Sequence, residues 1–230
     1  MGSTARMRWF IRITFVLFVV ACAWAANFHY GWLPRPSDEQ RRALDVLHEP
    51  NPVLGERNAF AAWWFLPYDI PVAELDRLLR EDAAAFAAAG DDPVTPFASK
   101  SATAFPKLDV PATEERLCPT WSSGCLDRVA SAAEQARTAD ARFAPFRARI
   151  ESLASFDHVS YGFPASDRFV ILPSDGIAEV ALVHAALLAA DGDADRALVE
   201  ACRFGGTWRR FRAHTDLLIV DMVSVAFASA

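Results

Sequence analysis

The feature that most constrains this chain is an apolar segment near its N-terminus. Residues 13–26 contain no charged side chain, and three basic residues, Arg6, Arg8 and Arg12, precede them. No acidic residue occurs before Asp38. Basic residues stay on the cytoplasmic side when an apolar segment enters a membrane, so everything after the segment is expected to be exported.

Aromatic flanks extend this segment toward the length of a membrane span. Residues 13–26 are shorter than the roughly 20 residues that cross a bilayer, but apolar and aromatic neighbours extend them to residues 9–32. Trp and Tyr rings settle at the headgroup level. We therefore predict a single-pass transmembrane helix over residues 9–32, within an N-terminal region 1–33 whose basic tip is cytoplasmic. A helical domain is predicted over residues 34–230.

Two alternatives to a retained helix stay open. Ala23, Trp24 and Ala25 fit the small-residue site at which a secretory signal peptide is cleaved. Residues 19–22 (Val-Val-Ala-Cys) loosely resemble a lipobox, although Leu is usual at its first position and the stretch after Cys22 is apolar. All three interpretations export the remainder of the chain.

The charge of the exported part argues against two classes of partner. The whole chain carries a net charge of −6, and residues 34–230 hold 20 basic and 29 acidic residues, a net charge of −9. Binding to nucleic acid needs clustered Lys and Arg, so no nucleic-acid partner is expected. An acidic body is also repelled by anionic lipid headgroups, so we do not expect it to lie flat on the membrane. The chain is 53% hydrophobic, which excludes intrinsic disorder.

Two of the four cysteines are spaced for a structural disulfide. Cys118 and Cys125 lie seven positions apart around a turn of Pro, Ser and Gly, which lets the two thiols approach to bonding distance. In an oxidising compartment this pair is predicted to form a disulfide. A redox pair would normally be C-x-x-C, and a zinc site needs two further soft ligands nearby. Cys202 is predicted to be a small buried hydrophobe in a helix.

The rest of the chain shows helical periodicity interrupted by proline. Ser37 and Gln40 form a capping box, and an apolar helix around Trp63 and Trp64 is predicted to be buried. Further helices are predicted over residues 71–89, 126–153, 174–190, 194–204 and 207–230. The helix 126–153 is expected to be kinked near Pro145, and Gly205 and Gly206 are expected to separate the last two helices. Ordered Pro-containing loops are predicted over residues 91–113 and 156–173.

These elements predict an all-α fold, in which an N-terminal transmembrane helix precedes an irregular bundle of helical hairpins with long Pro-rich loops. Residues 174–204 resemble a tetratricopeptide-type hairpin, but no second copy follows at a period of about 34 residues. The sequence stops at residue 230 without a helix cap or a polar tail. We therefore expect the natural protein to continue beyond it.

No pattern in the sequence predicts a catalytic, metal or cofactor site. Asp191, Asp193 and Asp195 mimic the first ligands of an EF-hand loop, but the later Gly and Glu are replaced, so these residues are predicted to cap a helix. The histidines show no paired zinc spacing, and His184 is predicted to be a hydrogen-bonded core residue. Nucleophile elbows, phosphate loops and dinucleotide fingerprints do not occur. We expect no cofactor and no bound metal.

The strongest charged feature lies near the C-terminus. Its members are Arg203, Arg209, Arg210, Arg212 and His214. These side chains could grip an anionic ligand, such as a phosphate or carboxylate, or contact an acidic partner surface. The alternative, which the pattern favours, is a solvated helix face with Trp208 and Phe211 packed inward.

Four features occur together: the block 56–66, the export segment, the spaced cysteines and the closing stretch 208–222. In this combination the chain resembles uncharacterised membrane-anchored helical envelope proteins of Gram-negative bacteria. The resemblance covers most of the chain, implies an envelope location and a helical fold, and carries over no functional residue. In that setting, helix 9–32 would cross the inner membrane, with the N-terminus cytoplasmic and residues 34–230 periplasmic.

Together these observations suggest a membrane-tethered interaction or scaffold module that binds an unknown envelope protein and is not an enzyme. The hypothesis depends on the predicted helical hairpins and on the lack of catalytic motifs. The alternative is an envelope enzyme or an anionic-ligand-binding protein that uses the region 203–214.

Overall fold

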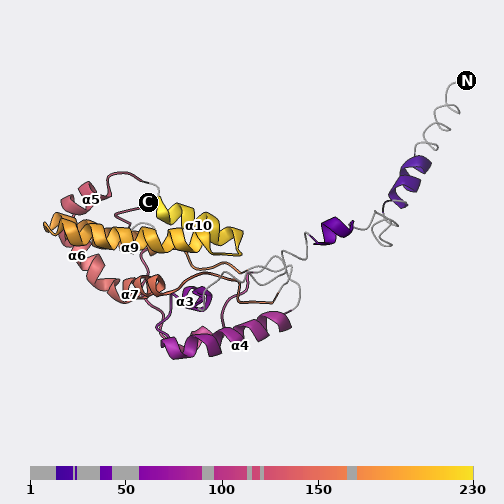
Figure 1. Ribbon diagram of the computed structural model, residues 1–230, viewed down its shortest axis with the longest axis horizontal. Coiled ribbons are helices and arrows are strands. Elements are labelled where there is room, and N and C mark those ends of the chain that lie inside the picture. Colours follow the sequence, from indigo (N-terminus) through magenta and orange to yellow (C-terminus); the bar gives the residue numbers. More distant parts are fainter. Residues whose placement is uncertain are drawn as a thin grey trace, which may run out of the picture. The chain divides into compact units, whose positions relative to one another are not determined.

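Helices joined by long coils make up the computed structural model (Figure 1). It describes residues 14–22, 24, 37–42, 57–89, 96–112, 116–119, 122–164 and 170–229. Within these residues, strand-like pairing is limited to the isolated bridges Asn58–His158, Tyr68–Lys107 and Val159–Thr215. The all-α prediction is therefore confirmed. The chain divides into two units, Met1–Pro52 and Val53–Ala230.

The N-terminal unit contains two short described helical stretches. Residues 14–22 are helical and exposed, and residues 38–42 form a further turn of helix. The predicted capping box is present at this turn: the Ser37 N–H donates to Gln40 Oε1 at 2.8 Å, and the Gln40 N–H donates to Ser37 Oγ at 3.2 Å. This reciprocal pair satisfies two N–H groups that the first turn of a helix cannot pair itself.

The predicted transmembrane helix is largely beyond what the structure describes. Among the described residues, no helix is both long enough and apolar enough to cross a membrane. Of the predicted span 9–32, the structure describes only residues 14–22 and 24, and the predicted boundary between residues 33 and 34 also lies outside the described residues.

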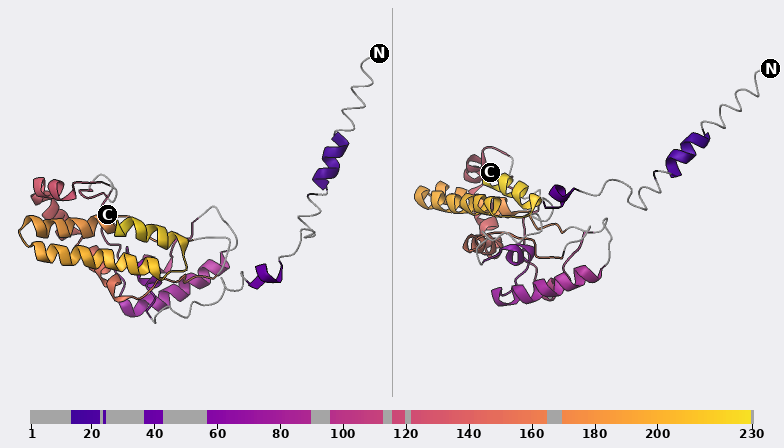
Figure 2. Two further views of the ribbon diagram at one scale, coloured as in Figure 1. Left: turned by 45° about the horizontal axis from the view of Figure 1, so that its top comes forward. Right: turned by 45° about the vertical axis from the view of Figure 1, so that its right-hand side comes forward.

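The larger unit begins with a helical hairpin and ends with three adjacent helices. Its described helices are α3 (Phe60–Trp64), α4 (Leu75–Ala88), α5 (Cys125–Ser131), α6 (Ala133–Arg142), α7 (Ala144–Ser152), α8 (Ile177–Ala190), α9 (Ala194–Ala213) and α10 (Leu218–Ala228). Helix α10 lies alongside α9 in every view (Figures 1 and 2), and α8 also packs against α9. Short 3₁₀ turns at residues 72–74, 101–104 and 153–155 join several of these elements.

The turn between α8 and α9 follows the prediction from its aspartates. Asp193 caps α9, because its side chain accepts a hydrogen bond from the Arg196 N–H at 3.3 Å. Asp191 pairs with Arg137 of α6 at 2.6 Å. These aspartates therefore fix a helix N-terminus and its contact with a neighbouring helix.

A large aromatic core fills the space between α3, α4 and α8–α10. Its fully buried side chains include those of Phe60, Trp63, Phe65, Trp208 and Phe211. The burial predicted for the Trp63–Trp64 helix is confirmed. The coil over residues 96–112 contributes as well, because Phe97, Phe105 and Leu108 pack against this core. We call this set the aromatic core.

A second, smaller cluster lies where α5, α6 and α8 meet. Its buried members are Cys118, Val129, Ala136, Val183, Ala186 and Leu187. The predicted disulfide between Cys118 and Cys125 is present, with Cα atoms 4.8 Å apart. We call this set the staple cluster.

The single helix predicted over residues 126–153 is wrong in one respect. The structure divides this stretch into α5, α6 and α7, with breaks at Ala132 and Phe143. The predicted interruption near Pro145 is present as the break at Phe143, and Pro145 itself lies in the first turn of α7, where a missing N–H breaks no hydrogen bond. The breaks let three short helices contact α8 in succession.

Two further predictions about the C-terminal helices are wrong. Gly205 and Gly206 do not interrupt the helix, since α9 runs through them to Ala213 and the chain turns only before α10. A glycine in a helix costs about 1 kcal/mol relative to alanine, and the packing of the neighbouring Trp208 outweighs this cost. Cys202 is exposed, because it lies on the side of α9 opposite the aromatic core.

Candidate functional site

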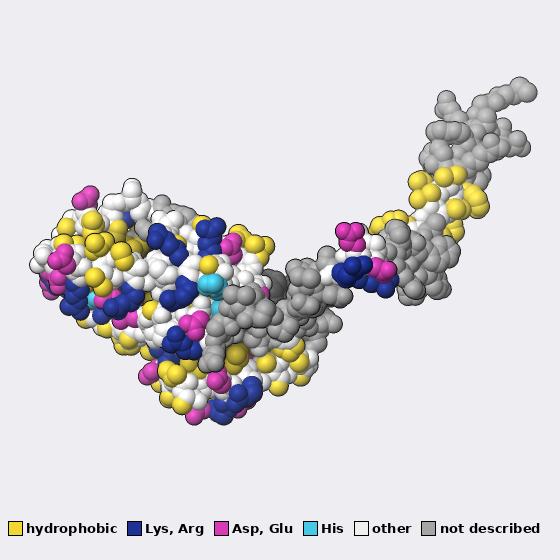
Figure 3. All heavy atoms as spheres, in the orientation of Figure 1, with side chains coloured by type: hydrophobic (Ala, Val, Ile, Leu, Met, Phe, Trp, Pro, Cys, Tyr) yellow, Lys and Arg dark blue, Asp and Glu magenta, His cyan; other side chains and the backbone are white. Residues whose placement is uncertain are grey.

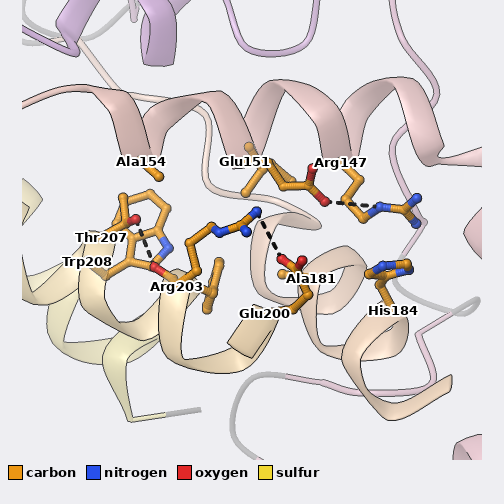
Figure 4. Close-up of a pocket in the computed structure, with 11 residues that line it drawn as sticks. Arg147, Glu151, Ala154, Ala181, His184, Glu200, Arg203, Thr207 and Trp208 are labelled. Atoms are coloured by element: carbon orange, nitrogen blue, oxygen red, sulfur yellow. Dashed lines mark hydrogen bonds and ion pairs between the residues drawn. The ribbon is translucent and has the colours of Figure 1, made fainter. Parts of the chain in front are cut away.

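A small pocket lies between α7, α8 and α9 and holds about 30 Å³ of free space (Figure 4). Its apolar side is formed by Ile150, Ala154, Ala181, Phe204 and Trp208. Its charged or titratable side chains are Arg147, Glu151, His184, Glu200 and Arg203. A space of this size admits a water molecule or one small chemical group.

The charged side chains at this pocket are joined in pairs. Arg203 Nη1 lies 3.2 Å from Glu200 Oε2, one turn away on α9. Arg147 Nε lies 3.3 Å from Glu151 Oε1 on α7. Both contacts are visible in Figure 4. Neither arginine therefore has a vacant guanidinium, but Arg203 is about half exposed, at 48%, and can turn toward solvent or toward a ligand.

His184, which lines this pocket, contacts Asp140 of α6, which does not. His184 Nδ1 lies 3.1 Å from Asp140 Oδ1, and Asp140 also pairs with Arg147. The prediction of a hydrogen-bonded His184 is confirmed, although its side chain is 16% exposed rather than fully buried. The Asp140 carboxylate connects α6, α7 and α8 through these contacts.

Trp208 carries the one buried polar group of this pocket that has no hydrogen-bond partner among the described residues. The residue is 1% exposed, and its buried indole Nε1–H has no hydrogen-bond partner among the described residues. A buried donor without a partner costs about 1–3 kcal/mol. The pocket therefore combines an unused donor with a neighbouring guanidinium.

The structure does not bring the predicted basic residues together. Only Arg203 lines the pocket. Arg210 Nη2 donates to the carbonyl of Ala154 at 2.8 Å, and Arg212 Nε lies 3.2 Å from Asp221 of α10.

The remaining two residues of the predicted set, Arg209 and His214, have exposed side chains. Trp208 and Phe211 are buried, at 1% and 0% exposure. This is the arrangement of a solvated helix face with its aromatic side chains packed inward.

A buried carboxylate beside the disulfide was not predicted. Glu179 is 5% exposed, and it accepts hydrogen bonds from the backbone N–H of Leu117 at 2.6 Å and of Cys118 at 2.9 Å. Burial raises the pKa of the Glu179 carboxyl, and the two backbone N–H groups offset part of that effect. Glu179 thus holds the coil before the disulfide against α8.

Glu179 also lines a second, more polar cavity of about 240 Å³. Arg116 and Asp175 lie at this cavity 3.5 Å apart, and Val223 and Phe227 of α10 form its apolar wall. One arginine and two carboxylates line it, and the arginine is already paired with Asp175, so the cavity defines no ligand class.

Helix α10 presents an apolar face to solvent. Val220 and Phe227 point into the core, whereas Leu218, Met222 and Val225 are 75%, 58% and 40% exposed. These three residues recur at intervals of four and three, so they form one stripe along the helix, and Ile219, 47% exposed, adjoins it. Sequence reasoning missed this stripe because an apolar helix is normally expected to be buried all round.

The fold and these sites define an all-α protein whose helical bundle is stapled by a disulfide. Among the described residues, no group of three or more His, Cys, Asp or Glu side chains could hold a metal ion. In comparisons with known proteins, no family model, no curated protein and no solved structure matches this chain.

Proposed function

We propose that this protein is a membrane-tethered interaction module of the cell envelope, which binds a helical segment of another envelope protein on the outward face of α10. The observation that carries the proposal is the stripe of exposed apolar side chains Leu218, Met222 and Val225. Contiguous apolar surface rimmed by polar residues is typical of an interaction site.

The chemistry of α10 favours a helix as the bound element. Asp221 is the only charged residue in this helix, and its carboxylate is paired with Arg212 at the edge of the stripe. Residues 218, 222 and 225 follow the spacing with which one amphipathic helix packs against another. The bound segment is therefore an amphipathic helix whose apolar stripe covers these three residues.

The test places a photo-crosslinking amino acid in the full chain within intact envelopes. We expect a single adduct of the same mass from positions 218, 222 and 225, and no adduct from position 72. Val72 is the matched control, because it is apolar and 74% exposed but lies outside α10. With the crosslinker at position 222, Leu218→Asp should abolish the adduct by placing a charge in the apolar contact.

Two outcomes of this experiment would contradict the proposal. One is that positions 218, 222 and 225 give no adduct beyond that of position 72. The other is an adduct with twice the mass of the chain, which would make the α10 face a contact between two copies.

The membrane tether is a separate part of the proposal. It is supported by the three arginines before the apolar segment 13–26 and by the disulfide, which is a bond typical of oxidising compartments. Reporter fusions after Pro36 should be active only outside the cytosol. Thiol labelling without a reductant should leave Cys118 and Cys125 unmodified. A fusion that is active only in the cytosol would overturn both the tether and the choice of an envelope partner.

A second candidate function is the binding of a small anion in the pocket between α7, α8 and α9. The observation that favours it is the unpaired Nε1–H of Trp208 beside the half-exposed Arg203. A carboxylate or phosphate oxygen would accept from the indole, and the guanidinium would neutralise its charge.

Titration with acetate and with phosphate tests this second function in the full chain. The indole N–H resonance that disappears in Trp208→Phe should shift on addition of one anion. The shift should disappear in Arg203→Ala and persist in Lys107→Ala, which removes an exposed cation far from the pocket in sequence. An unchanged indole resonance in both titrations would exclude an anion site.

A further inference from the structure

Helix α9 has an outward face that its own fold leaves uncovered. This face consists of Asp195, Leu198, Cys202, Gly206 and Arg209, spaced three or four residues apart so that they lie on one side of the helix. Leu198 is 64% exposed, and Cys202 is exposed as well. Figure 3 shows hydrophobic side chains gathered over the N-terminal half of this helix.

Close packing within the described part of the chain does not require the two glycines of α9. A Cβ atom added at Gly205 or at Gly206 would meet no heavy atom within 4 Å. Neither glycine has a positive φ, since those among the described glycines are Gly124, Gly176 and Gly192. Each glycine nevertheless costs about 1 kcal/mol relative to alanine inside a helix. A helix approaching from outside would use the flat surface that they create.

The residues of this face are arranged symmetrically about Cys202. Asp195 lies seven positions before Cys202 and Arg209 lies seven positions after it. Leu198 lies four positions before Cys202, and Gly206 lies four positions after it. In the same way, Val199 and Gly205 are each three positions away. Within this set of residues, each of the two charges therefore faces the opposite charge, and each of the two bulky side chains faces a glycine, at the mirrored position.

We propose that two copies of this chain pair through the outward faces of α9, with the helices antiparallel and Cys202 of each copy beside the two-fold axis. In this arrangement Leu198 and Val199 of one copy lie over Gly206 and Gly205 of the other. A two-fold interface uses one patch twice, so a self-complementary face of this kind is what such a dimer requires.

The charges at the two ends of the face fix this antiparallel register. Within the described part of the chain, Asp195 and Arg209 make no ion pair, although both side chains are exposed. In the antiparallel pair, Asp195 of each copy meets Arg209 of the other, which gives two equivalent ion pairs. A parallel pair would instead place like charges opposite each other, which is unfavourable.

The size of this contact predicts a reversible dimer. Residues 195–209 span about 21 Å of helix at 1.5 Å per residue. One helix pair of that length buries less surface than the roughly 1,600 Å² of a standard stable interface. We therefore expect a dissociation constant on the order of micromolar for the full chain in detergent micelles.

The proximity of the two Cys202 thiols gives a direct test. The full chain carrying Cys22→Ala retains Cys202 as its only free thiol, because Cys118 and Cys125 are joined to each other. A short bis-maleimide reagent, which alkylates one thiol at each end, should convert this protein to a crosslinked dimer. The yield should fall as the protein is diluted below its dissociation constant.

Charge variants then test the register in the same Cys22→Ala background. Arg209→Asp should weaken dimerisation about ten-fold, since each substitution acts twice across the axis. The double variant Asp195→Arg/Arg209→Asp should restore crosslinking, although both charges are then unfavourable for the dipole of α9 itself. This restoration separates an ion pair between copies from an effect on the stability of one helix.

Apolar variants provide matched controls. Leu198→Asp should abolish the crosslink, whereas Leu126→Asp, at an apolar residue of α5 that is 59% exposed, should leave it unchanged. Met222→Asp should also leave it unchanged, because Met222 belongs to the face of α10. The proposal is overturned if wild-type Cys202 gives no crosslinked dimer, if the double charge variant stays monomeric, or if Met222→Asp abolishes the dimer.

Discussion

The aromatic core and the staple cluster are stabilised in different ways. The aromatic core consists of interlocking rings, with centroids 4.7 Å apart for Trp208 and Phe227 and 4.9 Å apart for Trp63 and Trp208. The staple cluster contains small aliphatic side chains, and a disulfide and a buried carboxylate adjoin it. Helix α8 joins the two, since Val180 belongs to the first and Val183 to the second.

This difference shows how the aromatic core and the staple cluster of one helical bundle can be stabilised by different means. A large aromatic side chain buries about 150–250 Å², so a few rings supply most of the burial that the aromatic core needs. Alanine, valine and cysteine bury much less. The staple cluster therefore depends on a covalent bond that restricts the unfolded chain and on a carboxylate that fixes a coil.

Truncation of a ring in the aromatic core should produce the largest effect. Trp63→Ala removes a side chain that is 1% exposed, contacts Trp208 and donates from its Nε1–H to the carbonyl of Pro173 at 2.6 Å. We expect the free energy of unfolding to fall by about 3–5 kcal/mol, measured by urea unfolding of the full chain in mild detergent. Val72→Ala, at an exposed position, should cost less than about 0.5 kcal/mol. Equal losses in the two variants would disprove the importance of this core.

Loss of the disulfide should rank second. Replacing both Cys118 and Cys125 by alanine removes a crosslink between residues seven positions apart, and a loop of that size contributes about 2–3 kcal/mol. The same urea titration of the native chain in reductant should match the double variant. If reductant changes the stability of the double variant as well, the effect does not arise from this bond. A loss equal to that of Trp63→Ala would remove the contrast between the two clusters.

The carboxylate of the staple cluster should give a smaller, pH-dependent effect. Glu179→Gln keeps the shape of the side chain but puts an amide NH2 group, which cannot accept, in place of the oxygen 2.9 Å from the Cys118 N–H. We therefore expect a loss of about 1 kcal/mol at low pH, where the native carboxyl is protonated. Burial raises the pKa of Glu179 in the folded state above its ordinary value of 4.5. The folded state thus holds this proton more tightly than the unfolded state.

The sign of the pH effect follows from this shift. Because the folded state binds this proton more tightly, protonation of Glu179 stabilises the fold. This contribution to the free energy of unfolding is fully present below pH 4.5 and is lost as the pH rises through the folded-state pKa. The difference in unfolding free energy between the native chain and Glu179→Gln should therefore shrink with rising pH. Urea titrations at several pH values measure it, and a difference that grows with pH would show that the backbone N–H groups outweigh burial.

Local patterns in the sequence predicted the aromatic core and the disulfide. Trp63 and Trp64 lie in an apolar run without a polar face, and such a run is stable only when buried. Cys118 and Cys125 are close in sequence around turn-forming residues, so their pairing needs no knowledge of the rest of the fold. The caps at Ser37 and Asp193 are local for the same reason.

Features that depend on distant contacts were not predictable. Glu179 is an ordinary acidic residue in the first turn of a helix, and its burial depends on a coil about 60 positions earlier in the chain. The continuity of α9 through Gly205 and Gly206 depends on the packing of Trp208 against α3 and α10. The exposure of Cys202 follows from which side of α9 those contacts occupy.

The smallest predicted effect concerns glycine, and it contrasts a half-buried, closely packed position with the outward face of α9. Gly206→Ala should stabilise the monomer by about 0.5–1 kcal/mol, because the new Cβ meets nothing and alanine favours the helix. Gly162→Ala, beside the aromatic core, should have the opposite sign, because a Cβ there would lie 2.5 Å from the Phe60 ring. Urea unfolding at protein concentrations below the dimerisation range measures both. If Gly206→Ala destabilises the monomer as Gly162→Ala does, then the outward face of α9 is covered within a single copy, and the distinction between its buried and uncovered sides fails.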